Sequence, residues 1–201
     1  MNLFSDAKII ESSSKNASAW GTAVREGQIE SRTLVTNRAI VDVVLSRSPH
    51  SVLDLGCGEG WLARELAANA IDVIGIDVVP GLIERVRSAG IGTFHVASYE
   101  ELAADKLEIA ADVVVCNFAL LGNESVKDVF RSVPSMLNIH GSFIVQTLHP
   151  VVVCDDFPYR DGWREGSWDG FSSDFNRPSP VVLSDHRKLE NSVRRERVPP
   201  A

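Results

Sequence analysis

Short apolar runs alternate along the chain with segments whose apolar residues recur at helical spacing. The runs are rich in β-branched residues and cover 51–55, 72–76, 93–97, 111–116 and 142–148. The helical segments between them cover 61–70, 80–90 and 124–137, the last interrupted by Pro134. This order predicts an α/β fold: a Rossmann-like, doubly wound, mostly parallel sheet with helices on both faces.

The segments outside this alternating core have a different character. Residues 1–18 are polar and serine-rich, which predicts a mobile arm, and the helical pattern that follows to Leu45 is divided into two helices at Gly27. A turn at His140 and Gly141 is expected to precede the last strand. Residues 176–201 contain few apolar side chains, so the strands that would complete the sheet at its C-terminal end are expected to be incomplete and the tail poorly ordered.

Composition narrows the classes of partner. With 201 residues, 44% of them hydrophobic and 23% charged, the chain is typical of a globular domain. A formal net charge of -7 disfavours a nucleic-acid surface and favours small-molecule partners. The three cysteines are widely spaced, which predicts neither disulfides nor a metal site. Neither a leader peptide nor a long apolar span is recognisable, so we expect a cytoplasmic protein without membrane contact.

The stretch 52–60, VLDLGCGEG, joins the first apolar strand to a helix through a loop with few side chains. Gly56 and Gly58 let the backbone turn sharply and approach a ligand, and Cys57 between them is small. A dinucleotide fingerprint would have a third glycine where Trp61 stands, which disfavours an NAD-dependent oxidoreductase. Asp54 would repel a pyrophosphate but could attract the ammonium group of a methionine moiety.

This stretch resembles motif I of the class I S-adenosylmethionine-dependent methyltransferases. The resemblance covers about residues 16–175 and is greatest to a bacterial small-molecule branch, close to the enzymes of the ubiquinone and biotin pathways. It implies S-adenosyl-L-methionine as cofactor and a small-molecule methyl acceptor. The three parts of the chain would then be helices and an arm capping the cofactor (1–45), the binding core (46–150) and an acceptor cap with the tail (151–201).

Side chains that follow the strands are the other candidate site residues, because ligands bind at the carboxyl ends of parallel strands. Asp77 ends the second strand about 20 residues after the first glycine, where an acid can accept both ribose hydroxyls. By the resemblance, Ser98 and Tyr99 would contact adenine, although Ser98 could instead form a helix-capping box with the glutamate three residues on. Asn117 and Phe118 correspond to motif IV, which flanks the methionine and the methyl group; Phe118 could equally be core.

Residues that follow the last strand are the candidates for contact with the methyl acceptor. His149 follows the last strand and is the candidate base for an acceptor proton, with a structural role as the alternative. The aromatic and glycine-rich stretch 157–171 is expected to cap the acceptor or to pack on the sheet edge. If the sheet ends early, an open edge predicts a homodimer or a weakly active truncated enzyme. A cofactor-binding protein without turnover is the remaining alternative.

Overall fold

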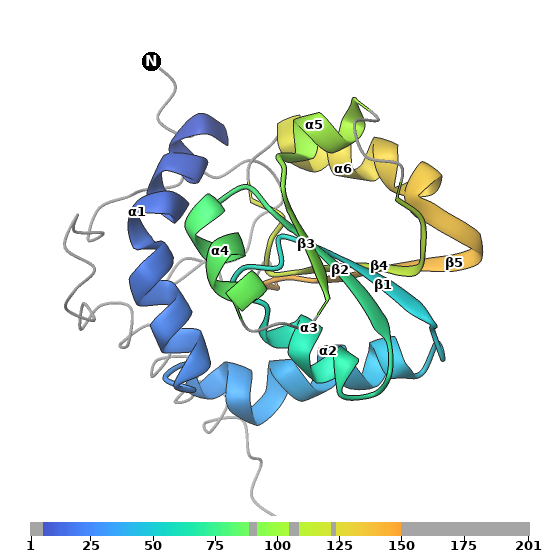
Figure 1. The fold of residues 1–201 in the computed structure, drawn as a ribbon, viewed down its shortest axis with the longest axis horizontal. Helices are drawn as coiled ribbons and strands as arrows, with labels where there is room; N and C mark the ends of the chain where they lie inside the picture. Colours follow the sequence, from blue (N-terminus) through green and yellow to red (C-terminus); the bar gives the residue numbers. More distant parts are fainter. Residues whose placement is uncertain (1–5, 89–91, 105–108, 122–123, 150–201) are drawn as a thin grey trace, which may run out of the picture. The chain divides into compact units, whose positions relative to one another are not determined.

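The computed structural model describes residues 6–88, 92–104, 109–121 and 124–149. It divides the chain into two units, Met1–Thr147 and Leu148–Ala201. The first unit is built on a five-stranded sheet in the order β3-β2-β1-β4-β5, with every neighbouring pair parallel (Figure 1). The strands are β1 (Ser51–Leu55), β2 (Asp72–Asp77), β3 (Thr93–Val96), β4 (Ala111–Asn117) and β5 (Leu137–Gln146). The predicted α/β, Rossmann-like parallel sheet is confirmed.

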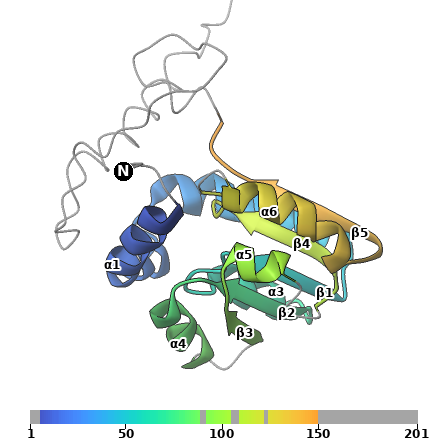
Figure 2. The ribbon, with the colours of Figure 1, turned by 90° about the horizontal axis from the view of Figure 1, so that it is seen from above.

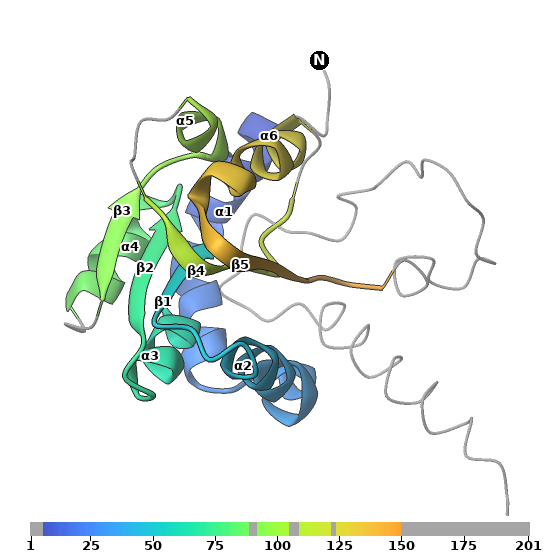
Figure 3. The same cartoon turned by 90° about the vertical axis from the view of Figure 1, so that its right-hand side faces the viewer.

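Helices cover both faces of this sheet. They are α1 (Asp6–Arg25), α2 (Asn37–Leu45), α3 (Trp61–Ala67), α4 (Pro80–Ser88), α5 (Tyr99–Ala103) and α6 (Glu124–Ser132). A π-helical turn, Arg32–Thr36, precedes α2, and a 3-10 turn, Val133–Met136, follows α6 at the predicted proline interruption. Figure 3 shows α5 and α6 on one side of the sheet and α2 and α3 on the other.

The core consists of two apolar clusters, one on each face of the sheet. Alternate residues of a strand point to opposite faces, so Val52 and Val113 pack with α2, α3 and α4, while Leu53 and Val114 pack with α5 and α6. All four of these side chains are buried. Burial on both faces explains why the strands appear in the sequence as continuous apolar runs.

The prediction of a mobile arm is wrong for residues 6–18, which form most of α1. This helix lies beside α4 (Figures 1 and 2), where the Arg85 guanidinium donates to the Ser18 hydroxyl over 3.0 Å. At its other end, the Asp6 carboxylate accepts a hydrogen bond from the Ser125 amide over 2.9 Å. These contacts with distant parts of the chain hold a polar helix in place, and local composition does not reveal them. The break after α1 at Gly27, where φ is +65°, was predicted correctly.

The last strand begins earlier than the sequence predicted. Residues His140 and Gly141 lie within β5 and not in a turn before it. The pairing with β4 shifts here, since Leu137 opposes Ala111 and Ser142 opposes Val113. His140 takes a φ of +70° inside this irregular stretch. A bulge and a turn use the same residue types, which is why the pattern alone was misleading.

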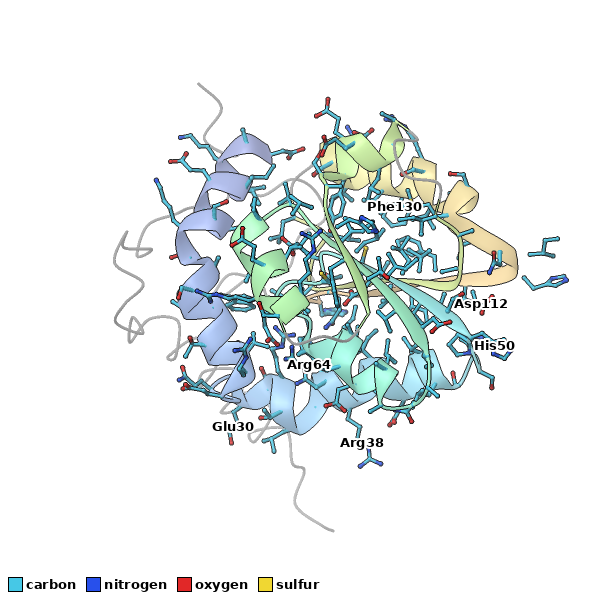
Figure 4. All side chains as sticks on the ribbon, viewed as in Figure 1. Glu30, Arg38, His50, Arg64, Asp112 and Phe130 are labelled. Atoms are coloured by element: carbon cyan, nitrogen blue, oxygen red, sulfur yellow. The ribbon has the colours of Figure 1, made fainter. Side chains whose placement is uncertain are left out.

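Asp112 closes the edge of the sheet where β1 begins. Its Oδ2 accepts hydrogen bonds from the backbone amides of His50 and Ser51 over 2.8 and 3.0 Å, and its Oδ1 accepts one from the side-chain amide of Asn138 over 2.9 Å. These bonds lower the pKa of Asp112 to about 2, that from Asn138 most strongly. Figure 4 shows Asp112 and His50 together at this edge, opposite the one that carries the candidate site. The cluster therefore serves the fold.

Candidate functional site

The loop between β1 and α3 is a tight glycine turn fastened to the next strand. The amides of Gly56 and Cys57 both donate to the carbonyl of Ile76, over 2.7 and 3.0 Å. Gly56, Gly58 and Gly60 all have positive φ, between 57° and 78°. This conformation costs an L side chain energy, and glycine adopts it freely. The sequence prediction of a sharp turn at these residues is confirmed.

The three glycines have different roles, which become clear when a Cβ atom is placed on each of them. At Gly56 it would lie 2.3 Å from the Ala119 Cβ and 2.9 Å from the Tyr99 hydroxyl. At Gly60 it would lie 2.1 Å from a methyl of Val86. At Gly58 it would meet no atom within 4 Å. Two glycines are therefore required by packing, while the backbone of Gly58 borders open space that a ligand can enter.

Asp77 lies at the end of β2 and holds this open part of the loop. Its Oδ2 accepts a hydrogen bond from the Gly58 amide over 2.9 Å, and its Oδ1 accepts one from the Val79 amide over 2.8 Å. Burial raises the pKa of Asp77, and the two hydrogen bonds partly oppose that rise. Each carboxylate oxygen can accept more than one hydrogen bond, so Asp77 can also receive donors from a ligand.

Asp54 is buried directly below the loop, with 2% of its surface exposed. Burial raises its pKa to about 7; the nearby charge of Asp77 adds to the rise, and that of Arg32 opposes it. A carboxylate so deprived of water is costly unless a cation is supplied. A ligand cation beside Asp54 would favour its ionised form and pair with it.

Arg32 supplies a positive charge beside these acids, and the sequence analysis did not find it. Its guanidinium carbon lies 5.7 Å from the ring centroid of Trp20, 5.4 Å from that of Trp61 and 5.9 Å from that of Phe118. Burial lowers its pKa, while Glu59 and Asp54 act against that change. The three rings come from separate segments, so no local sequence signal identifies this cluster.

Glu59, also missed, ties the loop to the helices around it. Its side chain is 1% exposed and forms ion pairs with Arg64 of α3 at 2.6 Å and Arg25 of α1 at 3.2 Å. The Arg64 guanidinium also donates to the Glu59 carbonyl over 2.8 Å. Figure 4 shows the labelled Arg64 beside α3. The available signal was an acidic residue within a glycine loop next to a buried strand. An acid in such a place is buried only when a basic partner is present, so a nearby arginine could have been expected.

Ser98, Tyr99 and Cys57 also surround the loop or lie near it. Ser98 caps α5 in the capping box that the sequence analysis gave as the alternative: its hydroxyl accepts a hydrogen bond from the Glu101 amide over 3.1 Å. The Tyr99 hydroxyl donates to the Ala119 carbonyl over 3.2 Å. Burial raises the pKa of the Cys57 thiol, which makes it a poor nucleophile. A ligand contact of Ser98 or Tyr99 stays a prediction.

Asn117 ends β4, and Phe118 follows it with a φ of +55°. The Phe118 amide donates to the carbonyl of Gln146, the last residue of β5, over 2.8 Å. The ring of Phe118 lies in the Arg32 cluster. His149 belongs to the second unit and is not placed relative to these residues, so its role as a base stays a prediction. The aromatic stretch 157–171 and the tail lie outside the described residues.

Taken together, the ends of β1 and β2 form a cradle with an open backbone, two acids and a neighbouring guanidinium. Most of the predicted residues meet there: Asp54, Gly56, Cys57, Gly58 and Asp77, with Tyr99 against the same loop. Such a cradle suits a ligand that carries hydroxyl groups for Asp77 and both a cation and an anion for Asp54 and Arg32.

Comparison with known proteins agrees with this geometry. Residues 52–141 match the family described as a methyltransferase domain. The ubiquinone biosynthesis O-methyltransferase of Azorhizobium caulinodans is 34% identical over 104 residues, which cover 50% of this chain and 41% of that protein. The chain thus spans about two fifths of the length of this relative.

Two solved structures share the fold. A TehB-like SAM-dependent methyltransferase from Corynebacterium glutamicum has 19% sequence identity and a TM-score of 0.53, over 65% of this chain and 71% of that one. An amino pentose methyltransferase from Micromonospora echinaspora, solved with SAM bound, has 19% identity and a TM-score of 0.52, over 63% of this chain and 56% of that one. Residues 52–141 therefore match a methyltransferase domain, and the chain shares the fold of these SAM-dependent methyltransferases.

Proposed function

We propose that the chain is an S-adenosylmethionine-dependent methyltransferase that transfers a methyl group to a small-molecule acceptor by in-line displacement. The observation that carries the proposal is the open backbone at Gly58, held by Asp77 and bordered by the buried Asp54. The cofactor carries ribose hydroxyls, an ammonium and a carboxylate, and this cradle offers a counterpart to each of them.

Each residue of the cradle would contact a different part of the cofactor. Asp77 would accept hydrogen bonds from the ribose hydroxyls, while Asp54 would attract the methionine ammonium and Arg32 its carboxylate. Gly56, Cys57 and Gly58 would let the backbone approach. Following the family resemblance, Ser98 and Tyr99 would contact the adenine, and Asn117 and Phe118 would flank the methionine.

The sulfonium group of the bound cofactor supplies an activated methyl group. Much of the acceleration can then come from holding the two reactants in line and excluding water, which is what this chain's residues would do. Trp20, Trp61 and Phe118 surround Arg32 with apolar surface and would limit access of water to that side. His149 would take the proton of an acceptor that has one to lose.

The proposal is tested by calorimetry with S-adenosylhomocysteine on the full chain. Replacing Asp77 by Ala should weaken binding by about 1.5–3 kcal/mol, the scale of hydrogen bonds to a charged group. Asp77→Asn keeps an oxygen for the Gly58 amide and serves as the control for loop geometry. Unchanged affinity in a folded Asp77→Ala protein would refute the placement of the ribose.

A thermal-shift comparison separates this function from its rivals. S-adenosylhomocysteine should stabilise the chain and NAD should not, because the bulky Trp61 occupies the place of the third glycine of a dinucleotide loop. Turnover on a pool of small acceptors then distinguishes an enzyme from a binding protein without activity.

Location and assembly complete the proposal. None of the helices in the described ranges is long and apolar enough to cross a membrane. We propose a cytoplasmic protein, as the cysteine pattern predicts, with no nucleic-acid partner, as the net charge of -7 predicts. A homodimer that covers the β5 edge is a further proposal, and light scattering tests it.

A further inference from the structure

Two amide side chains stand next to each other at the ends of β4 and β5. Asn117 and Gln146 are direct Cα partners in the parallel register. Side chains two residues apart in a strand point to the same face of the sheet, so Asn117 shares a face with Val115, and Gln146 with Ile144. Both of these apolar residues pack in the cluster on the α2 and α3 face. The two amides therefore lie on that face, at the carboxyl edge of the sheet.

Neither amide oxygen has a hydrogen-bond partner. Asn117 Oδ1 and Gln146 Oε1 are both buried and unpaired, and within the described part of the chain only Thr36 Oγ1 shares that state among side-chain oxygen and nitrogen atoms. Buried polar atoms are paired in the great majority of cases, because leaving one unpaired forfeits its bonds to water. Two adjacent amides could have satisfied each other, and these do not.

The position of the pair complements that of the cradle. The cradle occupies the ends of β1 and β2, and β4 lies next to β1 on the other side. Neighbouring strands are about 4.8 Å apart, so the end of β5 is about 10 Å from the end of β1. Phe118 connects the two regions, because its amide donates to Gln146 and its ring lies against Arg32.

We propose that Gln146, together with Asn117, binds the methyl acceptor through an O–H or N–H group on the atom to be methylated. This proposal rests on the function proposed above and narrows it to hydroxyl and amine acceptors. Unpaired carbonyl oxygens are satisfied by hydrogen-bond donors, which a carbon acceptor lacks and a thiol provides only weakly. Gln146 is then a specificity-determining residue of the acceptor site.

Methyl transfer to such an acceptor forms one bond and breaks another. A lone pair of the acceptor oxygen or nitrogen forms the new bond to the methyl carbon, the carbon–sulfur bond breaks, and its electron pair stays on sulfur. The acceptor proton passes to the base proposed above and from there to water. By accepting a hydrogen bond from the O–H or N–H group of the acceptor, the amide oxygens direct its lone pair toward the methyl group. A methylated hydroxyl no longer has a donor, so the product loses this contact and is released.

The first test needs no ligand and uses the full chain. Gln146→Met removes a buried unpaired oxygen at similar volume, whereas Val145→Met places the same side chain one residue earlier, on the opposite face. The melting temperature of Gln146→Met should exceed that of wild type by about 2–4 °C, and Val145→Met should show no such gain. A melting temperature for Gln146→Met that falls, or fails to exceed that of the control, overturns the proposal.

The second test measures methyl transfer from radiolabelled cofactor to phenol, aniline and thiophenol. Transfer to phenol or aniline should fall at least about tenfold in kcat/KM in Gln146→Met, while affinity for S-adenosylhomocysteine stays within about twofold. Preferred transfer to thiophenol, or transfer to phenol that Gln146→Met leaves unchanged, overturns the inference. Failure of the wild-type chain to bind S-adenosylhomocysteine would instead refute the proposed function.

Discussion

Replacing the buried Asp54 by Asn should stabilise the ligand-free chain, and should do so only at neutral and alkaline pH. The pKa of Asp54 is raised from 3.8 to about 7, with burial as the main cause. The unfolded chain loses this proton near pH 4, and the folded chain keeps it until about pH 7. Between these values folding takes up a proton, so stability falls as the pH rises.

The size of the effect follows from the width of that window. A shift of about three pH units, at about 1.4 kcal/mol each, makes the ionised Asp54 cost about 4 kcal/mol above pH 7. Asn has nearly the same shape and no charge to desolvate. Asp54→Asn should therefore gain about 3 kcal/mol in free energy of unfolding at pH 8 and almost nothing at pH 4. Arg32 recovers only part of the cost in wild type, because its charge is the smallest of the three causes.

Urea unfolding at pH 4 and pH 8 measures this directly. Asp72→Asn at the exposed start of β2 is the matched control and should change stability little at either pH. The same Asp54→Asn protein should bind S-adenosylhomocysteine at least about tenfold more weakly, because the ammonium loses its charged partner. The reasoning fails if Asp54→Asn is less stable than wild type at pH 8, or if its gain is the same at both values.

Two further predictions concern the loop and the opposite edge of the sheet. Gly58→Ala should fold with a loss of about 1–2 kcal/mol in stability from its positive φ, and it should lose cofactor affinity. Gly56→Ala should be much less stable, because its Cβ would meet Ala119 at 2.3 Å. Thermal unfolding measures both stabilities and calorimetry the binding; normal binding by Gly58→Ala would count against the open cradle. Asp112→Asn should lose only about 1 kcal/mol of stability at neutral pH, since the Asp112 side chain is partly open to water, which screens its charge. The stabilisation by Asp112 is complete above about pH 4 and is lost as the pH falls toward 2, so acid titrations of the two proteins should converge there.

Local pattern was sufficient for most of the elements and for part of the candidate site, although not for α1 or for the start of β5. The β1 bounds, the start of α3 at Trp61 and the acid that ends β2 all follow from signals contained within about ten residues. A buried strand is an apolar run, a glycine loop admits a ligand, and parallel strands place their carboxyl ends at one edge. These rules are local or topological, so a single sequence carries them.

Tertiary structure alone decided which residues meet. Arg32 reaches the site only because α1, α3 and the end of β4 bring three aromatic rings to it. The difference between Gly56 and Gly58 depends on Ala119, more than sixty residues away in the sequence. Gln146 became a candidate because the register sets it beside Asn117 and leaves both oxygens unpaired. Burial and pairing depend on neighbours distant in the chain, and hydrophobic pattern and turn chemistry carry no record of them.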